Sequence, residues 1–191
     1  MSYRSRRIVH GIVHKVVTGV VISAVLALGS TAAGAHVTPQ PPTLSKGASD
    51  VILGFAVPNE QTTASTIKLE LDLPVDHPIT GIHADAKPGW TSAVETVKLA
   101  KPITTDDGQI TEVVSKVTWT ATGPGIRPNE YSTFNLLAGL LPANVNTLRF
   151  AALQSYSDGT VVSWIEPVVK GTPAPQHPAP VLKLTGKAKK G

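Results

Sequence analysis

The feature that most constrains the fold is the spacing of apolar residues, which recur at every second position in several stretches from Ala48 onward. The clearest stretch is residues 66–73, where four aliphatic residues alternate with polar or charged ones before Pro74 ends the pattern. A period of two places alternate side chains on one face of a β-strand, whereas a helix requires spacings of three and four. No such helical stripe follows the first 35 residues, so the sequence predicts an all-β domain.

Other stretches with this alternation predict further strands, and Pro or Gly separates nearly all of them. The predicted strands are residues 50–57, 66–73, 92–99, 112–121, 131–139, 147–154 and 160–165. Turn sequences fall between them at Lys87-Pro88-Gly89, Asp106-Asp107-Gly108, Gly123-Pro124-Gly125 and Ser157-Asp158-Gly159. Seven or more short strands in one unit favour an antiparallel immunoglobulin-like or cupredoxin-like β-sandwich over a closed barrel.

Residues 1–35 have the order of a secretory signal peptide. Four basic residues precede an uncharged run at 16–33, and Ala33-Gly34-Ala35 forms an A-x-A cleavage pattern. An uncleaved membrane anchor is the alternative, since about 20 apolar residues span a bilayer, but glycine and hydroxyl residues weaken this run. We expect cleavage after Ala35 and an exported protein, periplasmic or secreted at the cell envelope, without a stable membrane span.

Cleavage also removes the basic character of the chain. Four of the 17 Lys and Arg residues and none of the 13 Asp and Glu residues precede the cut, so the mature chain carries no net formal charge. A domain without a basic stripe is not expected to bind nucleic acid. We predict a domain at residues 36–170, and a disordered tail at 171–191 because that segment is rich in Pro and Lys.

The chain contains no cysteine, and its single methionine is residue 1. Disulfides, thiolate metal sites and thiol catalysis are therefore excluded, and any metal must take nitrogen and oxygen ligands. Neither a G-x-S-x-G sequence nor an H-E-x-x-H sequence is present, so the common hydrolase motifs are missing as well.

Cleavage after Ala35 makes His36 the first residue of the mature chain. Its α-amine and imidazole Nδ1 can then close a six-membered ring on one metal ion, and such donors suit Cu(II), which heads the divalent affinity order. Free α-amines titrate near ~7.7–8.0 and free imidazoles near ~6.5, and both must lose protons to bind metal. Affinity should therefore fall below neutral pH. The alternative is a frayed terminus that begins with histidine by chance.

Four sequence segments together are more specific than any one of them. They are His36-Val37-Thr38-Pro39, Val57-Pro58-Asn59-Glu60, Pro88-Gly89-Trp90 and the run from Gln154-Ser155-Tyr156-Ser157-Asp158-Gly159 to Thr160-Val161-Val162-Ser163-Trp164. In their order and spacing, the chain resembles the YcnI family of exported bacterial copper-binding proteins over most of residues 36–166.

This resemblance implies a single-histidine brace on Cu(II). The implied site residues are His36 as the brace, Glu60 as the carboxylate that completes the coordination, and Trp164 adjacent to the metal. A carboxylate offsets the charge of the ion, and an indole face excludes water and favours a cation. Taken alone, Glu60 would read as a solvated turn acid and Trp164 as an ordinary core aromatic residue.

The remaining mature histidines match no ligand of that family. His77 is expected in a loop, His83 in a loop as well, and His177 in the tail. His77 and His83 lie six residues apart, which is not a spacing that places two ligands on one face.

The leading hypothesis is a copper-binding protein without enzymatic activity, a metallochaperone or buffer in copper homeostasis. The resemblance implies the copper ion and a membrane copper transporter or another envelope copper protein as partners. One alternative is a metal-free adhesion or scaffold module. Another is a copper-dependent oxidative enzyme, which would need a second histidine such as His83 close to His36. Without thioether ligands, Cu(I) should bind poorly, so we expect release on reduction.

Overall fold

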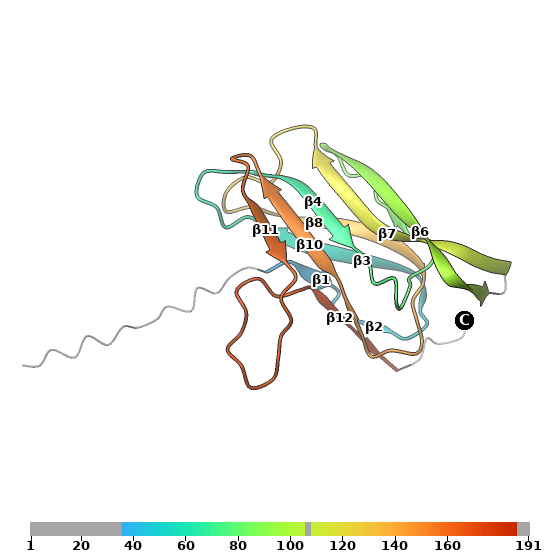
Figure 1. Ribbon diagram of the computed structural model, residues 1–191. Coiled ribbons are helices and arrows are strands. Elements are labelled where there is room, and N and C mark those ends of the chain that lie inside the picture. The colour runs from blue at the N-terminus through green and yellow to red at the C-terminus, as the bar shows by residue number, and fades with distance from the viewer. Residues whose placement is uncertain (1–35, 106–107, 187–191) are drawn as a thin grey trace, which may run out of the picture. The chain divides into compact units, whose positions relative to one another are not determined.

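The computed structural model describes residues 36–105 and 108–186. These residues form twelve β-strands and no helix (Figure 1), so the predicted all-β class is confirmed. The strands are β1 (Thr38–Gln40), β2 (Thr43–Ser45), β3 (Ser49–Pro58), β4 (Thr66–Asp72), β5 (His83–Ala84), β6 (Trp90–Thr105), β7 (Gly108–Ala121), β8 (Tyr131–Leu140), β9 (Thr147–Arg149), β10 (Ala151–Tyr156), β11 (Val161–Trp164) and β12 (Val181–Thr185). The predicted signal peptide lies outside the described residues.

The strands are arranged in three sheets. The first sheet has the order β1-β3-β8-β5, the second has the order β11-β10-β4-β7-β6, and the third has the order β2-β12-β9. Every named pairing is antiparallel except that of β12 with β2, which is parallel. In Figure 1 the second sheet lies in front of β3 and β8 of the first sheet.

The alternation along the strands fills the space between the first two sheets. Leu53, Phe55 and Val57 alternate along β3 and are fully buried, as are Leu69 and Leu71 on β4. Burial of each such side chain contributes roughly 1.5–3 kcal/mol relative to exposure. The sheets also meet through aromatic rings, because Trp119 of β7 lies with its ring centroid 5.2 Å from that of Phe134 on β8.

Each strand predicted from the sequence is present, and three of them differ clearly from the prediction in length or continuity. β6 and β7 are longer than predicted and form a hairpin of 16 and 14 residues. The predicted strand at 147–154 is divided into β9 and β10 at Phe150, whose backbone N–H donates to Pro180 O at 2.9 Å instead of to a neighbouring strand of the second sheet.

The prediction of a disordered tail at 171–191 is wrong for residues 181–185. They form β12, in which Leu182 and Leu184 are buried between β2 and β9. The partners are distant in sequence, and their apolar faces supply the burial that composition alone did not reveal. Residues 187–191 of the predicted tail lie outside the described residues.

One turn depends on a glycine for steric reasons. Gly125 has a φ of +69°, and a Cβ placed on it would lie 2.1 Å from the Thr66 carbonyl oxygen. Thr66 and Ile126 exchange two backbone hydrogen bonds at this point, of 2.8 and 3.0 Å. The glycine therefore allows the chain to approach the start of β4, as the predicted turn at residues 123–125 requires.

Candidate metal site

The N-terminal segment enters the domain along an edge of the first sheet. β1 pairs with β3, and the register sets Thr38 opposite Ala56 and Gln40 opposite Gly54. His36 precedes β1 by two residues, at the same end of this antiparallel pair as the end of β3 at Pro58. His36 itself is half-buried. The start of the predicted mature chain is thus held beside the end of β3, two residues before Glu60.

Trp164 lies at the end of β11, on an edge of the second sheet. The turn at Ser157-Asp158-Gly159 joins β10 to β11, as the sequence predicted, and sets Trp164 opposite Ala152. Asp158 Oδ1 accepts hydrogen bonds from the Thr160 hydroxyl at 2.7 Å and its backbone N–H at 3.0 Å, and these bonds lower the pKa of Asp158. The hairpin brings a largely buried indole to the edge where His36 lies.

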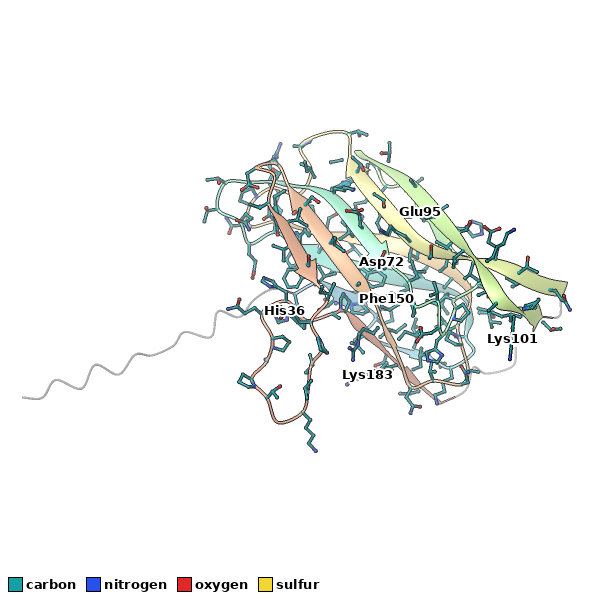
Figure 2. All side chains as sticks on the ribbon, in the orientation of Figure 1. His36, Asp72, Glu95, Lys101, Phe150 and Lys183 are labelled. Atoms are coloured by element: carbon teal, nitrogen blue, oxygen red, sulfur yellow. The ribbon has the colours of Figure 1, made fainter. Side chains whose placement is uncertain are left out.

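The two predicted residues His36 and Trp164 are in contact. Their ring centroids are 5.8 Å apart and their planes are inclined by 62°, an edge-to-face arrangement. Figure 2 shows His36 where the described chain begins, close to the end of β11. The indole therefore lies directly beside the half-buried imidazole.

Gln154 fixes the indole and connects it to the turn that carries Glu60. Its side chain is fully buried in β10. Gln154 Oε1 accepts a hydrogen bond from Trp164 Nε1 at 3.0 Å, while Gln154 Nε2 donates to Pro58 O at 2.9 Å and to Thr66 Oγ1 at 2.7 Å. A single amide therefore joins β11 to the end of β3. Gln154 opens the motif that ends at Trp164, and nothing in its sequence context indicates this link.

The turn after β3 presents Glu60 to solvent. Asn59 is buried, and its side-chain N–H groups donate to Ala64 O and Ile126 O, both at 2.8 Å, while its Oδ1 accepts from Gln61 N at 2.9 Å. These bonds fix the backbone on either side of the exposed Glu60.

Glu60 also acts electrostatically on a buried tyrosine. The pKa of Tyr156 is raised, mainly because the phenol is buried, while side-chain hydrogen bonds with Thr66 and Gln61 lower it and the charge of Glu60 raises it further. The Glu60 carboxylate is thus close enough to Tyr156 for its charge to matter.

His36 and Glu60 line different cavities. His36 opens onto a space of about 330 Å³ that is otherwise lined by residues 37–40, 42 and 178–181. Glu60 lines another space of about 420 Å³ with neighbours from residues 58–59 and 129–131. A larger, mostly apolar cavity of about 580 Å³ contains none of the three predicted site residues. Trp164 is therefore the predicted residue that the structure places directly against His36.

Side chains alone do not make a metal cluster in this domain. Across residues 36–105 and 108–186, no three His, Cys, Asp or Glu side chains are grouped so that they could hold a metal ion. A brace at His36 draws one nitrogen from the backbone α-amine, so it needs fewer side chains than such a cluster. The donor set available is nitrogen and oxygen, which suits Cu(II).

The other histidines are placed in three different ways. His77 lies in a turn, as predicted, and its Nε2 is 3.7 Å from Asp76 Oδ2. His83 was expected in a loop but forms β5, because it pairs with Leu137 of β8. β5 and β1 are opposite edges of the first sheet, and at about 4.8 Å per strand His83 is beyond coordination reach of His36.

His177 was expected in a disordered tail and is instead part of the domain. Its ring centroid is 5.2 Å from that of Trp164, with the planes inclined by 79°. His36 and His177 therefore both contact the one indole. The position of His177 depends on a loop whose return to the domain no local sequence signal marks.

Comparison with known proteins gives a family and a fold. The family described as "Domain of unknown function (DUF1775)" matches residues 36–184, and the chain belongs to this family. A solved structure of an uncharacterized protein from Nocardia farcinica, described as revealing an immunoglobulin-like fold, is 33% identical. The match covers 79% of this chain and 99% of that chain, with a TM-score of 0.63. No curated protein matches this chain.

These comparisons confirm the predicted β-sandwich and define it as immunoglobulin-like. The family match ends at residue 184, so it includes β12 and agrees with the correction to the predicted tail. None of the residues described here forms a helix with the length and apolar character of a membrane span.

Proposed function

We propose that this chain is an exported Cu(II)-binding protein that traffics or buffers copper in the cell envelope. The observation that carries the proposal is the contact of His36 with Trp164, at 5.8 Å between ring centroids. Most N-terminal residues have no reason to be held in place, because chain ends usually fray. Here the first residue after the predicted cleavage site is held against a buried aromatic ring.

In this proposal the α-amine and Nδ1 of His36 bind the ion and the Glu60 carboxylate completes the coordination. His36 precedes β1 by two residues and Glu60 follows β3 by two residues, so both lie at the same end of this antiparallel strand pair. Gln154 supports the arrangement by bonding both Pro58 and Trp164. Copper bound here would supply a Lewis-acidic cation that these residues carry, and we assign the protein no catalytic step.

The donor set also defines how the ion would be released. Both nitrogens of His36 must lose protons to bind, so affinity falls as the pH drops below neutral. With no cysteine in the chain and no methionine after residue 1, the site offers no sulfur ligand to Cu(I). Reduction would therefore favour transfer to a membrane copper transporter or another envelope copper protein.

The test is a calorimetric Cu(II) titration of protein that begins at His36. His36→Ala should abolish tight one-to-one binding, whereas the matched variant His77→Ala should bind as the parent does. Glu60→Gln should weaken binding without abolishing it. Unchanged binding in His36→Ala would refute the proposal and would favour a metal-free scaffold role for the sandwich.

A further inference from the structure

His177 shares the indole of Trp164 with His36. The ring centroids of His177 and Trp164 are 5.2 Å apart, and those of His36 and Trp164 are 5.8 Å apart. The distance between the two imidazole centroids is therefore at most the sum of these two distances. The family resemblance implies His36, Glu60 and Trp164 as site residues and gives no role to His177.

Backbone hydrogen bonds determine where His177 lies. It belongs to a return loop, residues 165–180, that leaves β11 and enters β12 (Figure 1). Glu166 N donates to His177 O at 3.1 Å, and Ala179 N donates to Glu166 O at 2.9 Å. His177 N also donates to Glu166 Oε2 at 3.0 Å. The loop therefore closes on itself two residues after Trp164, and β12 anchors its far end.

The residues after His177 face the N-terminal segment. His36 and Pro178, the neighbour of His177, line the same cavity of about 330 Å³. β12, which begins at Val181, also contacts β1. The return loop and the first residues of the predicted mature chain thus border one space.

Both imidazoles have nitrogens available for a ligand. The indole N–H of Trp164 is bonded to Gln154, so it does not occupy either histidine. Among the hydrogen bonds and ion pairs of residues 36–105 and 108–186, none involves a ring nitrogen of His36 or His177. Half-buried imidazoles with unused nitrogens are suited to bind a metal ion, and these two contact the same indole.

We propose that His177 supplies a second imidazole nitrogen to the Cu(II) that His36 binds. This inference rests on the proposed function and adds a ligand to the same site. The α-amine of His36 and the two imidazoles would give three nitrogens from only two residues, which explains why the site contains no cluster of three side chains.

The experiment separates ligation from packing by comparing two substitutions at one position. His177→Phe keeps an aromatic ring against Trp164 but removes both nitrogens, and His177→Ala removes the ring as well. His77→Phe is the matched control in an exposed turn. Cu(II) affinity is measured by competition with a chelator, and the number of coordinated imidazoles is counted by pulsed paramagnetic resonance.

The parent protein should show two coordinated imidazoles, and both His177 variants should show one. The Kd for Cu(II) should rise by about tenfold or more in both variants. Loss of a residue that only hydrogen-bonds to a metal ligand already weakens metal affinity by about 10–100-fold. If His177→Phe keeps the parent affinity and imidazole count, His177 only packs on Trp164 and this inference fails while the brace stands. If the parent protein binds no copper, the proposed function and this inference both fail.

Discussion

Replacement of Gln154 by leucine tests the connection between Trp164 and the turn after β3. The buried amide bonds Trp164 Nε1, Pro58 O and Thr66 Oγ1 at 3.0, 2.9 and 2.7 Å. A buried polar group left without a partner costs about 1–3 kcal/mol. In the leucine variant the Thr66 hydroxyl keeps its hydrogen bond with Tyr156. The two groups left without a partner are therefore Trp164 Nε1 and Pro58 O. Because leucine has a similar volume and leaves no large cavity, the expected loss in unfolding free energy is the sum for these two groups, about 2–6 kcal/mol.

The assay is urea unfolding followed by tryptophan fluorescence and analysed by linear extrapolation. The matched control is Gln109→Leu, on the exposed surface of β7, which should change the unfolding free energy by no more than about 0.5 kcal/mol. The reasoning is refuted if Gln154→Leu loses less than about 1 kcal/mol, or if the two variants are equally stable.

Three further predictions concern the fold around the site. Gly125→Ala should lower the unfolding free energy by more than about 2 kcal/mol, because Gly125 has a positive φ and lies against the Thr66 carbonyl. The control Gly123→Ala should be nearly neutral, because Gly123 faces open space. Equal urea midpoints for the two variants would contradict this prediction. Leu182→Ala should lower the unfolding free energy by about 2–5 kcal/mol, whereas the control Lys183→Ala, at an exposed position of the same strand, should change it little. An unchanged unfolding free energy in Leu182→Ala would indicate that β12 does not form. Burial raises the pKa of Tyr156, so its contribution to stability is complete below about pH 10 and is lost as the pH rises through the folded-state value. Tyr156→Phe should therefore lose less stability than the parent in alkaline unfolding, and a parallel decline would contradict the assignment.

The period-two pattern predicted the strands well because each depends on its own residues. Residues 66–73 alternate strictly, and β4 occupies all of this stretch except Leu73. The turn at Ser157-Asp158-Gly159 was equally local, since its residues supply both the side-chain acceptor and the glycine. The contact of His36 with Trp164 was expected only from the family resemblance, and the structure supports it with a direct ring contact.

What the sequence did not reveal depends on partners distant in the chain. Leu182 and Leu184 alternate around Lys183, but the surrounding prolines and lysines are typical of disorder, and β2 and β9 are needed to bury the strand. His177 could not be placed because its position depends on the bonds with Glu166 across the return loop. Gln154 looked like one more residue of a strand, and only the fold shows that it is the buried link in the site.

The central claim is that copper binds through the free α-amine and imidazole of His36. The most direct test compares paramagnetic resonance spectra of one equivalent of Cu(II) bound to protein beginning at His36 and to protein with one additional alanine before His36. The extension keeps every side chain, makes the α-nitrogen of His36 an amide and moves the free amine one residue away from the imidazole. For the protein that begins at His36, we predict a single tight site whose spectrum shows directly coordinated amine and imidazole nitrogens. The protein with the additional alanine should not show this spectrum. Identical spectra and affinities in the two proteins would contradict the account.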